Sequence, residues 1–136
     1  MQAIHVQHYL TRARDFLKGM DLLRDDLTEF KSSCALLGVH CAISYSDALR
    51  IGMGCVDLTS DDHQTAASDL IARLTSRKFE KIQGAVRLAR LLARKNRIAY
   101  AAASARENEV EDIVKQAERF AFWAEEAGRY LQIEGW

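Results

Sequence analysis

The sequence of 136 residues has no proline, few cysteines and no net charge. Proline breaks helices because it removes a backbone donor and clashes with the preceding turn, so its absence favours long, uninterrupted helices. The balance of 19 basic and 19 acidic residues argues against wholesale attraction to nucleic acid or to an anionic membrane. A local basic patch is still compatible with such binding.

Long apolar runs are also missing. No stretch approaches the length of a membrane span, so we expect no contact with a membrane. The N-terminus has no basic segment followed by an apolar run, which is the pattern of a secretory signal. We therefore expect a cytoplasmic protein.

The three cysteines, Cys34, Cys41 and Cys55, form no CxxC pair. Cys34 and Cys41 are separated by roughly 10 Å along a helix, which is too far for a disulfide. We expect all three to be reduced, buried thiols. His5 and His8 have no carboxylate or cysteine within one further turn, so we predict no metal site, and nothing in the sequence indicates a cofactor.

Apolar residues recur every three or four positions along most of the chain, which is typical of amphipathic helices. The pattern predicts five helices, at about 2–27, 29–53, 61–75, 79–103 and 107–131. No strand pattern, internal repeat or interdomain linker is present. Short connections between long helices favour antiparallel neighbours. We therefore predict a single all-α domain over residues 1–136, an antiparallel up-and-down bundle of four to five helices.

The second predicted helix is apolar around nearly its whole circumference. Such a helix is buried by neighbours on several sides or by a second subunit, so we place it at the centre of the bundle. Asp47 lies within it and needs a partner, because an unpaired buried carboxylate is costly. An arginine or lysine from the fourth helix is the natural candidate.

The fourth predicted helix carries a concentration of basic residues, and its predicted inner face includes Val86 and Ala93. Arg87, Arg90, Arg94 and Arg97 are spaced three, four and three residues apart, so they project from one face. Guanidinium groups fit phosphates because each offers a rigid fork of donors that stays charged. The acidic residues of the fifth helix offer an alternative, in which they neutralise this row across an antiparallel pair.

Three segments resemble the HEPN superfamily of helical bundles. The segment Arg94–Tyr100 is similar to the superfamily motif of an arginine, a polar residue and, four to six positions after the arginine, a histidine. The segment His40–Leu49 is similar to the small-residue second helix of those proteins. Asp61–His63 resembles the start of their third helix. The resemblance implies a HEPN-like bundle and a homodimer.

In active members of the superfamily, arginine and histidine from two subunits meet and cleave RNA without a metal. Histidine can move protons near neutral pH, and arginine stabilises charge on the phosphate. This sequence departs from the pattern because Tyr100 stands at the histidine position. A tyrosine hydroxyl titrates near pH 10, so it is a poor base at neutral pH. The substitution favours a binding or regulatory protein over a ribonuclease.

The resemblance thus predicts a nucleic-acid- or nucleotide-associated protein with a site at Arg94, Asn96 and Tyr100. We expect Arg90 and Arg97 to add phosphate contacts. Asp47 and His40 are expected to be supporting polar residues. The superfamily's bacterial members often accompany nucleotidyltransferases or toxin–antitoxin partners, which suggests such a partner here. Two alternatives are a metal-independent ribonuclease with a degenerate site and a non-catalytic oligomeric scaffold.

Overall fold

The computed structural model describes residues 2–58, 62–95 and 106–136, and every regular element in these ranges is helical. The expected all-α class is therefore confirmed for this part of the chain. The α-helices are α1 (Gln2–Leu23), α2 (Leu27–Gly52), α3 (His63–Ser76), α4 (Gln83–Ala93) and α6 (Glu107–Tyr130), and the short 3-10 helix η1 (Arg24–Asp26) joins α1 to α2. Within these ranges no helix combines the length and the apolar character that a membrane span requires.

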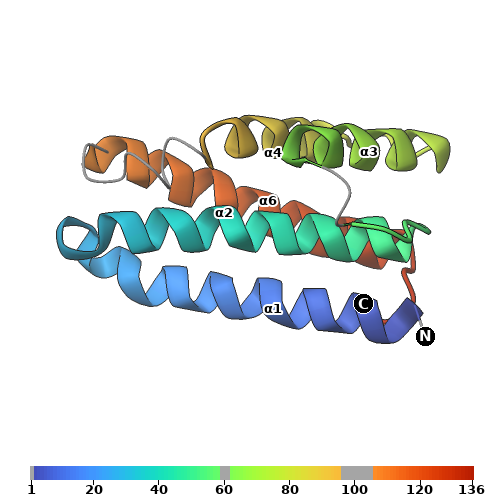
Figure 1. The fold of residues 1–136 in the computed structure, drawn as a ribbon, viewed down its shortest axis with the longest axis horizontal. Helices are drawn as coiled ribbons and strands as arrows, with labels where there is room; N and C mark the ends of the chain where they lie inside the picture. Colours follow the sequence, from blue (N-terminus) through green and yellow to red (C-terminus); the bar gives the residue numbers. More distant parts are fainter. Residues whose placement is uncertain (1, 59–61, 96–105) are drawn as a thin grey trace.

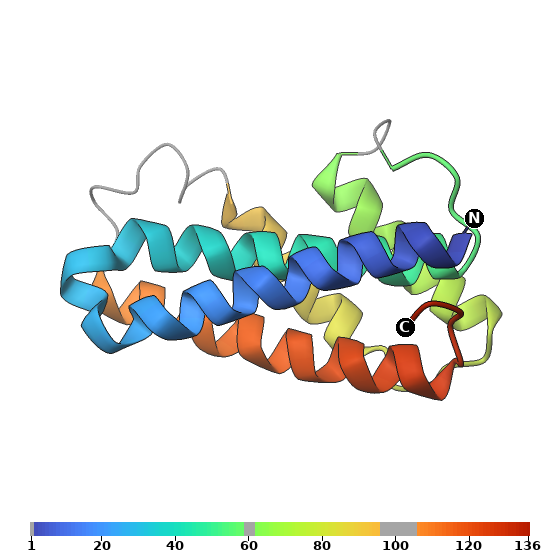
Figure 2. The same ribbon diagram turned by 90° about the horizontal axis from the view of Figure 1, so that it is seen from below.

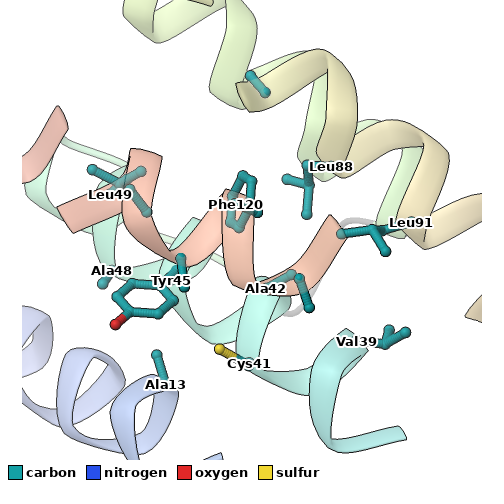
Figure 3. Packing of buried hydrophobic residues seen from close by; sticks show 14 of the residues in the cluster. Ala13, Val39, Cys41, Ala42, Tyr45, Ala48, Leu49, Leu88, Leu91 and Phe120 are labelled. Carbon is teal, nitrogen blue, oxygen red and sulfur yellow. The ribbon is translucent and has the colours of Figure 1, made fainter. Parts of the chain in front are cut away.

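Helix α2 occupies the centre of the bundle, as its apolar circumference predicts. It packs against α1 on one side, against α6 on another, and against α3 and α4, which form a layer above it in Figure 1. Figure 3 shows Leu88 and Leu91 of α4 and Phe120 of α6 gathered over the part of α2 that carries Val39 and Ala42. All five side chains are buried. The central position of α2 thus follows from burial on several sides.

Several neighbouring helices run antiparallel, as expected, whereas α2 and α6 run in the same direction. Helix α1 runs against α2, and α4 runs against both α3 and α6 (Figures 1 and 2). The step from α2 to α3 differs from the up-and-down prediction. Gln64 contacts the carbonyl of Ala89, and the far end of α3 lies beside Met53, so α3 runs in the same general direction as α2. The ten-residue connection 53–62 is long enough, at about 3.3 Å per residue, to return the chain along α2.

The helix ends show why the predicted boundaries shift. Asp62 caps α3 by accepting a hydrogen bond from the backbone N–H of Thr65, so α3 begins two residues later than predicted. Helix α4 begins at Gln83 rather than at Phe79. Lys78 adopts a left-handed conformation after α3, with φ of 58°, and this turn redirects the chain before α4 can start.

The buried face of α4 agrees only in part with the one that the sequence predicts: Ala85 and Leu92 are buried as expected. Leu88 and Leu91 are almost fully buried, whereas Val86 keeps 41% of its surface exposed and Ala93 is exposed as well. The expectation for Val86 and Ala93 is therefore wrong. Helix α4 packs against both α2 and α6, and Leu88 and Leu91 lie on the part of its surface that these two helices cover.

Two contacts hold α4 close to α6. The ring of Trp123 lies over Gly84, where an added Cβ would come within 2.0 Å of the indole. The indole N–H also donates to the carbonyl of Lys81 at 2.7 Å. Glycine at position 84 thus permits the close approach that sets α4 alongside α6.

A polar cluster ties the C-terminal residue Trp136 and helices α1, α2 and α6 together. Glu125 of α6 accepts two hydrogen bonds from the Arg14 guanidinium at 2.8 Å, one from the Tyr45 hydroxyl at 2.8 Å and one from the Trp136 indole at 3.0 Å. Burial favours a higher pKa for Glu125, but the donors from Arg14 and Tyr45 outweigh burial and lower it. The N- and C-termini lie at the same end of the bundle (Figure 2).

Candidate functional site

Three arginines of α4 line one hollow between α4 and α6. Arg87, Arg90 and Arg94 face Asp112 and Gln116 across a space of about 170 Å³, and we call this space the arginine groove. The spacing of three and four residues predicts this shared face, and the structure confirms it for these three residues. Helix α4 runs antiparallel to α6, so its arginines meet the first half of that helix (Figure 1).

Arg94 carries the acidic contact that the sequence offers as an alternative. Its guanidinium donates to Asp112 at 2.7 Å. This hydrogen bond lowers the pKa of Asp112, so the carboxylate stays ionised at neutral pH. Among the described residues, Arg87 and Arg90 have no carboxylate within ion-pair distance. The neutralisation therefore covers one of the three arginines.

The remaining basic residues before α4 do not join this face. Arg73 donates to Asp69 at 2.8 Å and to the carbonyl of Met53 at 3.0 Å, and Arg77 donates to the same carbonyl at 3.1 Å. These two arginines close the end of α2 rather than facing solvent as a row. Lys78 and Lys81 line a different hollow. The basic residues of the segment 73–94 are thus divided among three places.

Asn96, Arg97 and Tyr100 lie outside the residues that the structure describes. The described part of the motif consists of Arg94, which is half-buried, and Lys95.

The structure places Asp47 away from the arginine groove. Its cationic neighbours are Arg50, one turn along α2 at 3.8 Å, and Arg12 of α1. The expected partner from the fourth helix is therefore wrong among the described residues, because this face of α2 turns toward α1. Burial raises the pKa of Asp47 to about 6, against the smaller opposing effects of Arg50 and Arg12.

The histidine candidates likewise lie apart from the groove. His40 packs against Phe16 of α1, with ring centroids 5.8 Å apart, and so belongs to the contact between α1 and α2. His5 and His8 are exposed on α1. Among the described residues, no three histidine, cysteine, aspartate or glutamate side chains converge as metal ligands.

Sequence reasoning missed a buried arginine. Arg50 is 1% exposed, and its Nε donates to Asp69 of α3 at 2.7 Å. Asp69 accepts from Arg73 as well, so one carboxylate serves two guanidinium groups. Burial favours a higher pKa for Asp69, but these two donors reverse the direction and lower it. A buried arginine in an apolar helix is itself a signal that an acidic partner lies elsewhere in the chain.

The fold and site define an all-helical protein with an arginine-lined groove between two antiparallel helices. In the groove, Arg87 and Arg90 present donors that suit phosphate oxygens, and Gln116 adds an amide. Comparisons of the chain with models of known families, with curated proteins and with solved structures found no match.

Proposed function

We propose that this chain binds the phosphates of RNA or of a nucleotide in the arginine groove. The observation that carries the proposal is that, in the part of the chain that the structure describes, three guanidinium groups line one groove against a single carboxylate, Asp112. Arg87 and Arg90 lie one helical turn apart and point to the same space. Such a row offers successive bidentate donors to successive anionic groups.

The resemblance to the HEPN superfamily supplies the choice of RNA and the setting of the proposed function. In this proposal the chain is a HEPN-like homodimer in the cytoplasm and acts as a binding or regulatory protein for RNA or a nucleotide. It accompanies a nucleotidyltransferase or a toxin–antitoxin partner. Binding is favoured over cleavage because Tyr100 replaces the histidine that would move protons.

The electrostatics of the groove support binding without a large net charge. The chain as a whole is neutral, so long-range attraction to a polyanion is weak. Among the described residues that line the groove, three cations face one anion, and Arg87 and Arg90 make no ion pair that a ligand would first have to break. The groove therefore concentrates positive charge at one place on a neutral protein.

Binding of a short fluorescein-labelled RNA strand at low salt, followed by fluorescence anisotropy, tests the proposal. Arg90→Ala should weaken binding about tenfold, because a hydrogen-bonded charge contact is worth about 1.5 kcal/mol. Arg90 is exposed and lacks a carboxylate partner among the described residues, so its removal leaves no partner stranded. Lys18→Ala, at an exposed cation on α1, is the matched control and should bind as the wild type does.

Equal affinities of wild type and Arg90→Ala would overturn the proposed function. Competition with unlabelled ATP distinguishes a nucleotide ligand from an RNA strand. If the groove binds a nucleotide, ATP should displace the labelled RNA at ATP concentrations near the Kd for ATP. The same samples, incubated with EDTA and resolved on a gel, test the ribonuclease alternative. Cleavage that is lost in Arg94→Ala would establish it.

A further inference from the structure

A second hollow, of about 600 Å³, lies at the other end of the α4–α6 pair. It is formed by the turn between α3 and α4 and by the second half of α6. Its lining includes three aromatic and three basic side chains: Phe79, Trp123, Tyr130, Lys78, Lys81 and Arg129. We call it the aromatic hollow.

The aromatic residues make an apolar floor with one exposed ring, that of Tyr130, at its edge. Phe79 is 9% exposed and its ring centroid lies 6.2 Å from that of Trp123 and 5.6 Å from that of Tyr130. Tyr130, in contrast, is 76% exposed. A planar group that enters the hollow can stack on the ring of Tyr130, because aromatic rings offer a sequence-tolerant platform to any base.

The basic residues give this floor a positive rim. Among the described residues, Lys78 and Lys81 have no carboxylate within ion-pair distance, although Glu80 and Glu126 also line the rim, and Arg129 pairs with Glu125 at 3.8 Å. An aromatic floor with a cationic rim suits a planar group that is attached to an anion. A nucleobase joined to its phosphate has this chemistry.

Lys78 occupies a backbone position that glycine fills elsewhere in this chain. After α2, Gly54 takes the left-handed conformation with φ of 99°, and Cys55 N–H bonds back to the carbonyl of Arg50. After α3, Lys78 takes the same role with φ of 58°, and Phe79 N–H bonds back to the carbonyl of Leu74. A side chain costs about 1 kcal/mol in this conformation. The lysine at the rim is therefore present at a cost to stability.

The aromatic hollow and the arginine groove lie along the same side of α6. Gln116 lines the groove and Trp123 lines the hollow, seven residues further along, which is two helical turns or about 10 Å. Tyr130 follows after seven more residues. Positions seven apart share a helix face, so the groove and the hollow form one track beside α4.

From this alignment, and resting on the function proposed above, we propose that the ligand is single-stranded nucleic acid. Its phosphates lie along the arginine groove, and one unpaired base enters the aromatic hollow and stacks on Tyr130. A duplex cannot do this, since its bases are already paired and stacked inside the helix.

Anisotropy measurements with a labelled single strand and with the same strand annealed to its complement test this inference. The single strand should bind about tenfold more tightly than the duplex, whether it is RNA or DNA. Tyr130→Ala should reduce this preference by about the same factor, and Tyr130→Phe should restore it because the ring is kept. Phe122→Ala removes another exposed aromatic side chain of α6, outside the hollow, and should have no effect.

The left-handed positions provide a second pair of variants. Lys78→Gly should raise the Tm and weaken binding of the single strand. Gln132→Gly relieves the same conformation after α6, where φ is 52°, and should raise the Tm with binding unchanged. Because both variants gain stability, a binding defect in Lys78→Gly alone cannot come from misfolding.

Equal binding of single strand and duplex, or a Tyr130→Ala protein that binds like the wild type, would overturn the inference. The function proposed for the arginine groove would survive that result, since phosphates are available in both forms. If Arg90→Ala binds normally while Tyr130→Ala does not, the arginine groove is overturned and the hollow alone holds the ligand.

Discussion

Arg94, the residue that caps the end of α4, and Asp112 of α6 form an ion pair of 2.7 Å in the lining of the arginine groove. The pair satisfies the one arginine that the groove shares with the HEPN-like motif. It leaves Arg87 and Arg90 facing the same space without a carboxylate partner among the described residues. Asp112 therefore competes with any anionic ligand for Arg94.

Substitution of Asp112 tests this competition. Asp112→Asn removes the negative charge from the groove and releases Arg94, so the affinity for labelled RNA should rise several-fold at low salt. The control is Glu111→Gln, which removes a neighbouring exposed carboxylate that does not line the groove. Weaker binding in Asp112→Asn would show that the carboxylate positions Arg94 for the ligand instead of competing with it.

Asp69 should govern acid stability. Its pKa is lowered in the folded state, so its contribution is present above the unfolded carboxyl pKa of 3.8 and is lost as the pH falls through the lowered folded value. Asp69→Asn removes the charge of the carboxylate that contacts the buried Arg50 at 2.7 Å and should cost about 3 kcal/mol at pH 7.

Urea titrations across the acid range measure this effect. The gap in the free energy of unfolding between wild type and Asp69→Asn should be constant near neutral pH and should close below about pH 4. A gap that does not change with pH would mean that the carboxylate is not the source of the stability.

Asp47 should have the opposite pH dependence. Its folded pKa is raised to about 6 from 3.8, so the folded state holds the proton more tightly than the unfolded state does. Ionisation therefore destabilises the fold as the pH rises from about 4 to about 6, at a cost of roughly 3 kcal/mol when complete.

The neutral isostere removes this cost. Asp47→Asn should be about 3 kcal/mol more stable than the wild type at pH 7.5 and about equally stable at pH 4. Asp15→Asn, at an exposed carboxylate of α1, is the control and should give no such pH-dependent gain. Lower stability of Asp47→Asn at pH 7.5 would show that the contact with Arg50 outweighs burial.

The sequence predicts the helices well because their apolar faces repeat at a helical period. Val6, Leu10, Ala13 and Met20 of α1 are all buried as that period requires. The sequence predicts α4 less well. No glycine marks the turn at Lys78, and the close approach of Trp123 to Gly84 depends on tertiary packing.

The candidate site, too, could be predicted from the sequence only in part. The shared face of Arg87, Arg90 and Arg94 follows from spacing alone, since three- and four-residue steps fix a helix face. The ion pair with Asp112 depends on the register between α4 and α6, which the sequence does not encode locally. The aromatic hollow is a feature of three-dimensional arrangement, because Phe79 and Tyr130 lie far apart in the chain.

The salt dependence of RNA binding tests the arginine groove most directly. Each phosphate contact with a single strand contributes about 0.7 to the slope of log Kd against log salt concentration. If Arg87 and Arg90 both contact phosphates, the Arg87→Ala/Arg90→Ala double variant should have a slope smaller than that of the wild type by about 1.4. Parallel slopes for the two proteins would contradict the account.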